Sequence, residues 1–238
     1  MKILVVAECA SQHGGDMNLA KRYIEKAKKS NVDVCKFQYF NVDDGFFPRD
    51  DPRFEQVKQA QLSLEQLSQL WDYCESVGIG FLVTPFASTR RVEELASLGL
   101  RKVKIREADS QKLDMINRAL QLFDEVYIST TQVPLDPFFR YHPHLKFLMA
   151  TPKYPYPTEE FELARATSFD GLSDHTQGIT VSVAAAAVAK ASGKDSFIVE
   201  KHVTLDHSIP NLDQSVSIDF NELKELVRHL RAIERIKG

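Results

Sequence analysis

The stretch from residue 171 to 206 constrains the fold most strongly. It reads GLSDHTQG, then a helix-like run of small residues over 179–191, then FIVEKHVTLD. This pattern predicts a strand, a helix and a second strand, with His175 and His202 at the two strand ends. If the strands are parallel neighbours, their carboxyl ends lie side by side and the two imidazoles converge on one point.

Two histidines with open positions around them suit a catalytic divalent metal better than a closed structural site. Because side chains alternate along a strand, Ser173 shares a face with His175, and Glu200 shares one with His202. A hydroxyl and a carboxylate therefore lie just below the imidazoles. Either histidine alone is more often an ordinary polar residue at a strand end. Their equivalent positions on consecutive strands favour a shared metal site.

The rest of the chain repeats this alternation of strand and helix. Strands are expected at 3–8, 32–38, 81–86, 101–109, 125–130, 145–150 and at the two positions above. Helices are expected at 17–30, 63–77, 88–98, 111–123 and 159–167, with a short one in 132–144 and a last one capped by Asn221. Eight such units in 238 residues predict a single-domain (β/α)₈ TIM barrel over residues 1–238, an α/β fold with its active site at the carboxyl ends of the strands.

Composition excludes several classes of protein. A net charge of −3 with both signs interspersed argues against a nucleic-acid partner. No apolar run approaches the ~18 residues of a membrane span, and no basic leader precedes the first strand, so we expect a cytoplasmic protein without a membrane partner. Cys9, Cys35 and Cys74 are expected to be reduced, packed thiols.

Polar side chains also interrupt the other strands where these end. Two lysines and several hydroxyls converging on one barrel mouth indicate an anion site that suits phosphate or carboxylate. Arg106, just beyond a strand end, is a further candidate. The residues expected at this mouth are Glu8, Lys36, Gln38, Lys104, Ser129, Thr130, Ser173, His175 and His202.

Several stretches together resemble the sialic acid (N-acetylneuraminate) synthase family. AECASQHGGD, VDVCKFQ, FLVTPF, KI and IST are similar to its successive strands, and LSDHT and EKHVTLD are its most specific motifs. The resemblance spans almost the whole chain in the same order. It implies a barrel that condenses phosphoenolpyruvate with a sugar aldehyde and uses a divalent metal, above all Mn²⁺, with Mg²⁺ or Co²⁺ as options.

The resemblance also implies roles for individual residues. His175 and His202 match the metal ligands, and Glu8 matches the acidic residue near the metal and the aldehyde. A second group matches the positions that hold phosphate and carboxylate: Lys36, Lys104, Ser129 and Ser173. A third group matches the positions that face the sugar: Gln38, Tyr154 and Asp213.

The chain departs from the family pattern at several positions. Glu107 stands where a phosphate-binding serine is expected, and its carboxylate would repel phosphate unless Arg106 pairs with it. Thr131 replaces a glycine, Pro152 an asparagine, and Ser11-Gln12 a small residue and asparagine. The family's antifreeze-like carboxyl-terminal domain is not expected here, and the oligomeric state stays open, with a homodimer as one option.

These departures leave three functions open: the synthase, a metal-dependent aldolase, lyase or isomerase on another sugar-like substrate, and a catalytically silent sugar- or phosphate-binding barrel. The polar segment 41–60 contains Phe46, Phe47 and Phe54 and is the long insertion near the mouth. We predict that it covers the site as a lid and restricts the acceptor to something smaller than an N-acetylated hexosamine.

Overall fold

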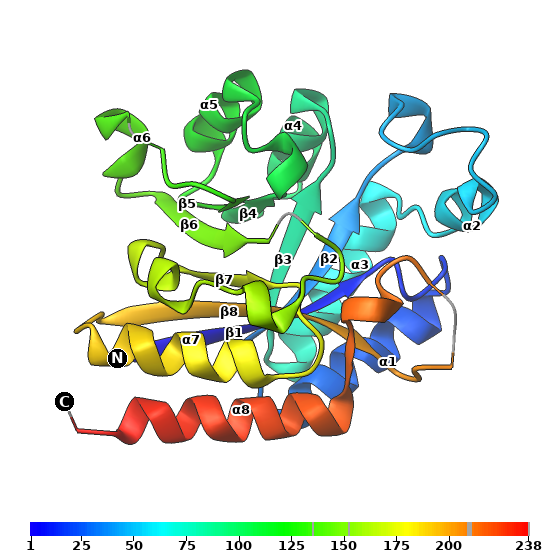
Figure 1. Cartoon of the computed structure of the whole chain (residues 1–238). Helices are drawn as coiled ribbons and strands as arrows, with labels where there is room; N and C mark the ends of the chain where they lie inside the picture. Colours follow the sequence, from blue (N-terminus) through cyan, green and yellow to red (C-terminus); the bar gives the residue numbers. More distant parts are fainter. Residues whose placement is uncertain (135, 152, 209–210, 238) are drawn as a thin grey trace.

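Eight strands form a parallel sheet that curls into a nearly closed barrel (Figure 1). The computed structural model describes residues 1–134, 136–151, 153–208 and 211–237. The strands are β1 (Lys2–Ala10), β2 (Val34–Tyr39), β3 (Gly80–Pro85), β4 (Lys102–Ile105), β5 (Glu125–Thr130), β6 (Leu145–Ala150), β7 (Gly171–Asp174) and β8 (Ser196–Thr204); a two-residue strand, β9 (Ile218–Asp219), pairs with the end of β8. The predicted TIM barrel is confirmed.

The barrel has one seam. The hydrogen-bonded order is β3-β2-β1-β8-β7-β6-β5-β4, so β3 and β4 lie next to each other at its two ends without a ladder between them. At the mouth, side chains from the turn after β4 join the two edges. Asp109 Oδ2 accepts a hydrogen bond from the Ala87 amide at 3.0 Å, and Lys112 Nζ donates to the Ala87 carbonyl at 2.9 Å.

Helices surround the sheet, and α7 and α8 lie along β7, β8 and β1 (Figure 1). The α-helices are α1 (Met17–Lys29), α2 (Phe54–Gln59), α3 (Leu64–Val77), α4 (Thr89–Ser97), α5 (Leu113–Leu122), α6 (Pro137–Arg140), α7 (Thr180–Ala191) and α8 (Phe220–Arg235). The main hydrophobic core lies between this helical layer and the outward faces of the strands.

The inside of the barrel changes from apolar to polar along most of its strands. A small apolar plug fills its amino-terminal half, formed by Val6, Leu82, Tyr127, Leu148 and Ile198. Two positions further along four of these strands, on the same face, stand Glu8, Thr84, Ser129 and Glu200. The plug closes the barrel from below, so the polar side chains lie at the bottom of a cavity that opens at the carboxyl ends.

Three helix predictions differ from the structure. Residues 159–167 form 3₁₀ turns, at Thr158–Glu160 and Leu163–Ser168, in place of an α-helix. The segment 41–60 contains α2, which was predicted as loop. The last helix is capped by Asp219, not Asn221, because the Asp219 carboxylate accepts hydrogen bonds from the first-turn amides and Glu222 completes a capping box.

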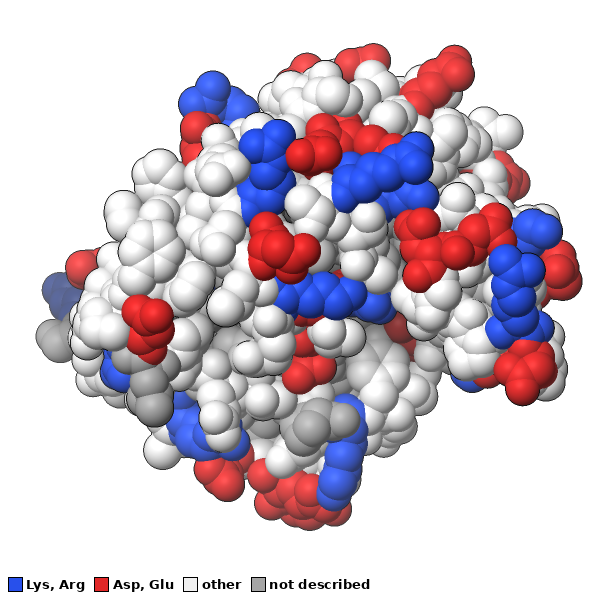
Figure 2. Space-filling view, turned by 90° about the horizontal axis from the view of Figure 1, so that it is seen from above, with Lys and Arg blue, Asp and Glu red and all other residues white. Residues whose placement is uncertain are grey.

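Other expectations agree with the structure. Asp16 and Ser63 cap α1 and α3 through their side chains. The three cysteines are free and buried. Acidic and basic side chains are interspersed over the face shown in Figure 2, and no helix among the described residues is long and apolar enough to cross a membrane.

Candidate active site

One cavity of about 420 Å³ opens at the carboxyl ends of the strands and collects almost all of the predicted site residues. Eleven of the twelve line it: Glu8, Lys36, Gln38, Lys104, Arg106, Ser129, Tyr154, Ser173, His175, His202 and Asp213. Eight further residues also line it, among them Phe46 and Phe47 of the predicted lid and the departure Glu107: Phe46, Phe47, Thr84, Phe86, Glu107, Ala108, Glu200 and Leu212. Strand alternation predicts the inward direction of the strand residues in the first set, whereas Arg106, Tyr154 and Asp213 lie on loops.

Thr130 is the exception, and its predicted position was wrong. It follows Ser129 on β5, so its side chain points to the opposite face. Its hydroxyl donates to the Gln132 carbonyl at 3.0 Å. Thr130 lines a separate cavity of about 350 Å³ beside β5, α5 and α6.

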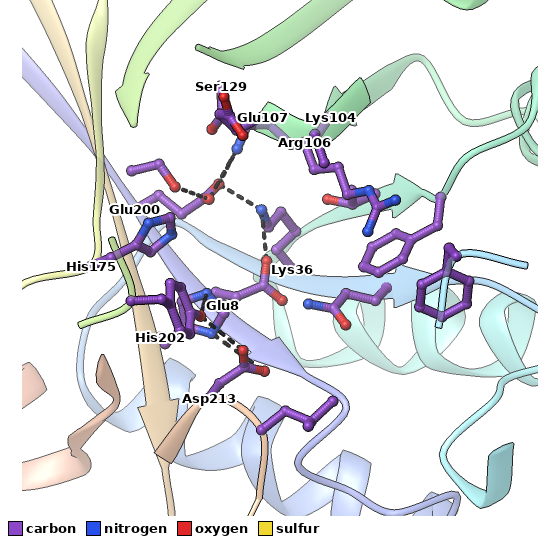
Figure 3. A pocket seen from close by; sticks show the side chains of 18 of the residues that line it. Glu8, Lys36, Lys104, Arg106, Glu107, Ser129, His175, Glu200, His202 and Asp213 are labelled. Carbon is purple, nitrogen blue, oxygen red and sulfur yellow. Dashed lines mark hydrogen bonds and ion pairs between the residues drawn. The ribbon is translucent and has the colours of Figure 1, made fainter. Parts of the chain in front are cut away.

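Glu200 is the centre of the ion network at the bottom of the cavity (Figure 3). Its carboxylate lies 2.8 Å from Lys36 Nζ and 2.9 Å from Lys104 Nζ, and it accepts a hydrogen bond from Ser173 Oγ at 2.8 Å. Lys36 Nζ is also 2.6 Å from Glu8 Oε2. All five side chains are almost completely buried. The predicted pair of lysines is therefore present, but carboxylates of the protein already share its positive charge.

This network shifts the protonation equilibria of its members. Burial lowers the pKa of Lys36 to about 7, against the attraction of Glu200. Burial acts in the opposite sense on Glu200, yet Lys104 and Lys36 hold the pKa of its carboxyl well below its usual range. Glu200 is thus a fixed negative charge, and Lys36 is a cation that can release its proton near neutral pH.

The two histidines lie close together beside this network, with ring centroids 5.7 Å apart (Figure 3). Burial lowers the pKa of each to about 3, so both imidazoles are neutral at pH 7. The Nδ1 atoms of His175 and His202 are buried and have no hydrogen-bond partner among the described residues. Neutral imidazole nitrogens without a partner are the donors that a divalent metal requires, and they fit the predicted pair of ligands.

Tyr154 and Asp213 complete this side of the cavity. Tyr154 Oη lies 3.0 Å from His202 Nε2 and donates a hydrogen bond to Asp213 Oδ1 at 2.8 Å. Asp213 Oδ2 is 3.8 Å from His202 Nδ1. Within the described ranges, three donor atoms lie within 4.8 Å of one another only at His207, Asp219 and Glu222, on the partly exposed entry to α8. Among the described residues, the two pocket histidines therefore have no third His, Cys, Asp or Glu donor atom that close.

Arg106 does not pair with Glu107. Its Nε donates to Asp109 Oδ2 at 2.6 Å, and its guanidinium stacks 4.1 Å from the centroid of Phe86 and 5.5 Å from that of Phe46. Glu107 is exposed at the cavity, and its carboxylate pairs with no described residue. The compensation that phosphate would need beside Glu107 is therefore absent from the part of the chain that the structure describes. Pro152, the other departure nearby, lies outside the described residues.

The segment 41–60 contributes an aromatic wall. Phe46 and Phe47 line the cavity, and Phe46 packs edge-on against Phe86 with centroids 5.2 Å apart. Phe40, Val42, Val57 and Ala60 form a small buried cluster behind them. The segment is thus anchored to the barrel and borders the site.

Glu200 and Thr84 are the functional candidates without a predicted role. Glu200 shares the inward face of β8 with His202, so its position was predicted, but its contacts join β8 to β2 and β4 across the barrel. Thr84 occupies the inward face of β3, and its buried hydroxyl has no partner within the described residues. In both cases alternation along the strand was the available signal.

Comparisons with known proteins agree with this geometry. The chain is 29% identical to the N,N'-diacetyllegionaminic acid synthase of Campylobacter jejuni, over all of this chain and 78% of that protein. It is 28% identical to the human N-acetylneuraminate-9-phosphate synthase, over 98% of this chain and 71% of that protein.

Among solved structures, the sialic acid synthetase of Leptospira borgpetersenii superposes with a TM-score of 0.86 at 25% identity, covering 100% of this chain and 86% of that one. The family model that describes the NeuB family matches residues 23–238, which include the metal-site candidates, both lysines and the cavity wall. The chain therefore belongs to the NeuB family.

Proposed function

We propose that this protein condenses phosphoenolpyruvate with an aldehyde or aldose to give a 2-keto-3-deoxy acid, and that it uses a divalent metal, Mn²⁺ before Mg²⁺ or Co²⁺. The observation that carries this proposal is the single cavity in which two neutral histidines, two buried lysines and Glu8 converge. The names of the relatives, which are nonulosonic acid synthases, support the same class of reaction.

The lysine side of the cavity suits the enolpyruvate. Lys36 and Lys104 lie within 2.9 Å of Glu200, so an incoming carboxylate or phosphate would share these ammonium groups with it. The hydroxyl of Ser129 is buried, lines the cavity and has no partner among the described residues, so it can donate to the anion. The unpaired Glu107 would repel phosphate, which favours a position for it on the lysine side.

The histidine side suits the aldehyde. A cation held by His175 and His202 would supply a Lewis acid that polarises the aldehyde oxygen. Tyr154, Asp213 and Gln38 offer donors and acceptors for hydroxyl groups of the acceptor. These side chains would orient the aldehyde carbon toward the methylene carbon of the enolpyruvate.

Glu8 lies between the two sides. Its Oε1 accepts a hydrogen bond from the Ala10 amide at 2.6 Å, and its Oε2 faces Lys36, so its carboxylate is held in one orientation. We assign to it the orientation or deprotonation of the water that adds to the enol carbon. The new bond joins the methylene and aldehyde carbons, one water is consumed, and inorganic phosphate leaves.

The acceptor is restricted by the aromatic wall. Phe46, Phe47, Phe86 and Leu212 all line the cavity and all pack against the buried cluster of Phe40, Val42, Val57 and Ala60. This wall favours an acceptor that is smaller than a full N-acetylated hexosamine and has an apolar face.

Glu107 supports a second candidate, a metal-dependent aldolase or lyase whose substrate has no phosphate. An unpaired carboxylate at the cavity is compatible with a less anionic substrate. Such an enzyme would use the same histidines and Glu8.

A single assay separates the two candidates. Mn²⁺-loaded protein is incubated with phosphoenolpyruvate and a panel of aldoses, and phosphate release and product mass are followed. The synthase predicts aldose-dependent phosphate release and a product with the mass of the aldose plus pyruvate. The Glu8→Gln variant is the control, since its side chain keeps the shape but loses the base. Binding of phosphoenolpyruvate without turnover of any aldose would contradict the synthase.

A further inference from the structure

A buried ion pair lies directly behind the two histidines, on the outer side of the barrel wall. Asp174 and Lys201 face each other in the register of β7 and β8. Lys201 Nζ is 3.2 Å from Asp174 Oδ2, and both side chains are completely buried. Each residue directly precedes a histidine, so its side chain points away from the cavity while the histidine points into it.

The pair belongs to a network that fixes the backbone after β7. Asp174 Oδ1 accepts hydrogen bonds from the amide of Thr176 at 2.8 Å and from its hydroxyl at 2.7 Å. Asp174 Oδ2 accepts one from Ser182 Oγ in α7, and Lys201 Nζ donates to the Thr176 carbonyl. The backbone on both sides of His175 is therefore bound to β8 and to α7.

The His175 carbonyl is held as well. It accepts a hydrogen bond from the Tyr156 amide at 2.9 Å, in an isolated parallel bridge between Tyr156 and Thr176. His202 stands on the longer strand β8, which is paired with β1 up to this residue. His175, by contrast, directly follows the short strand β7, and the hydrogen bonds of this network hold the backbone around it.

Stability alone does not account for the pair. Removing two charges from water costs free energy that their attraction often fails to recover, and apolar replacements of similar volume are frequently neutral. The pair lies directly behind His175 and His202, which would hold one ion between them. In that position the pair can fix the spacing of the two imidazoles. We propose that Asp174 and Lys201, with Ser182 and Thr176, are positioning residues that set the separation of His175 and His202. This inference rests on the metal site of the proposed function.

The test is the double variant Asp174→Asn/Lys201→Met, which removes both charges and keeps the side-chain volumes similar. Mn²⁺ affinity is measured by calorimetry, and the coordination geometry is read from the visible absorption spectrum of the Co²⁺-loaded protein. We expect the affinity to fall by about tenfold or more, as for other residues that orient metal ligands, and the Co²⁺ bands to shift.

Arg231→Met/Asp33→Asn is the matched control. It removes an ion pair of 2.7 Å between α8 and the start of β2, at the other end of the barrel. It should lower the melting temperature but leave the Mn²⁺ affinity and the Co²⁺ spectrum unchanged. If the double variant does not fold, Ser182→Ala and Thr176→Val each remove one hydrogen bond to Asp174 and should weaken Mn²⁺ binding in the same direction, by a smaller factor.

The outcomes are distinct. Wild-type protein that binds no Mn²⁺ would overturn the metal site and this inference together. Wild-type binding with unchanged affinity and spectrum in the folded variants would overturn the positioning role alone.

Discussion

The two sides of the cavity differ in how their side chains are held. The pocket floor is formed by Glu8, Lys36, Glu200 and His202 on β1, β2 and β8 and by His175 directly after β7; His175 is half-buried, and the other four side chains are almost completely buried. The pocket wall, formed by Phe46, Phe47, Phe86, Arg106 and Glu107, comes from the segments after β2, β3 and β4 and is more exposed. In the floor, Glu8, Lys36, His175 and His202 match the family pattern, whereas Glu107 in the wall departs from it. The proposed reaction therefore rests on the floor, and the proposed choice of acceptor rests on the wall.

The floor is where we expect the largest effects. His175→Ala and His202→Ala should each weaken Mn²⁺ binding by more than about 100-fold, since loss of residues that merely orient ligands already costs about 10–100-fold. The fold should remain intact because neither imidazole belongs to the apolar core. The bound metal content is measured by elemental analysis after dialysis, and circular dichroism checks that each variant is folded. Equal metal content in both variants and wild type would rule out the shared site.

Lys36→Ala and Lys104→Ala should have the second-largest effect, a loss of affinity for an anionic ligand. Each removes a charge-assisted contact to an anionic ligand worth about 1.5–3 kcal/mol. Calorimetric titration with phosphoenolpyruvate should show this loss, while the affinity for a neutral acceptor changes little. Each variant also leaves Glu200 with one ammonium fewer, so a lower melting temperature is expected. Undiminished phosphoenolpyruvate affinity in both would exclude the lysines as the anion site.

Deletion of residues 43–52 tests the wall. It removes Phe46 and Phe47 and should reduce turnover on the order of tenfold, because water enters and the acceptor is less confined. Mn²⁺ affinity should stay the same, since the deleted segment does not touch the histidines. Phe54→Ala, outside the cavity lining, is the control. Full turnover by the deletion variant, or good turnover of N-acetylmannosamine by wild type, would show that the segment is no lid.

The pH dependence of anion binding tests one floor residue. The pKa of Lys36 is lowered to about 7, so its positive charge is present below pH 7 and is lost as pH rises through this value. Phosphoenolpyruvate affinity should therefore fall about fivefold between pH 7 and pH 8, as the protonated fraction falls. Titrations of wild type and Lys36→Ala give the comparison, and the variant should lack this step. A wild-type affinity that is flat over the same interval would contradict the shift.

Glu107→Ser should have the smallest effect, and it should raise the affinity for phosphoenolpyruvate where the preceding changes lower binding or turnover. Removing an exposed carboxylate near the anion should raise phosphoenolpyruvate affinity about two- to fivefold at low ionic strength. The gain is small because two like charges about 4 Å apart in water repel each other by only ~1 kcal/mol. Salt should reduce the gain. Glu159→Ser, an exposed carboxylate outside the cavity, controls for net charge. Identical affinities in low salt would place the anion far from Glu107.

The sequence predicted the floor better than the wall for a physical reason. Position on a strand determines direction, so Glu8, Lys36 and His202 could be assigned to the mouth from alternation alone. Alternation also placed Glu200 inward, but its contacts with Lys36 and Lys104 depend on the closure of the barrel. Thr130 was assigned inward with Ser129, although adjacent residues must face opposite ways.

Loop and cap residues were harder to predict because their partners are not fixed by periodicity. Arg106 could have paired with Glu107 or Asp109, and the fold of the turn after β4 selects Asp109. Asp219 and Asn221 are both good capping residues, and the short strand β9 sets the start of α8 at the first of them.

The seam between β3 and β4 has different mechanical consequences for the pocket floor and for the pocket wall. Separating β1 from β8 would break a continuous ladder, whereas separating β3 from β4 would break side-chain contacts alone, such as those between Ala87 and Asp109. The barrel is therefore most compliant at this edge. In the strand order, β7 and β8 stand diametrically across the ring from it. A displacement of the wall at this seam would therefore leave the ladder between β7 and β8 intact, and with it the spacing of the two imidazoles.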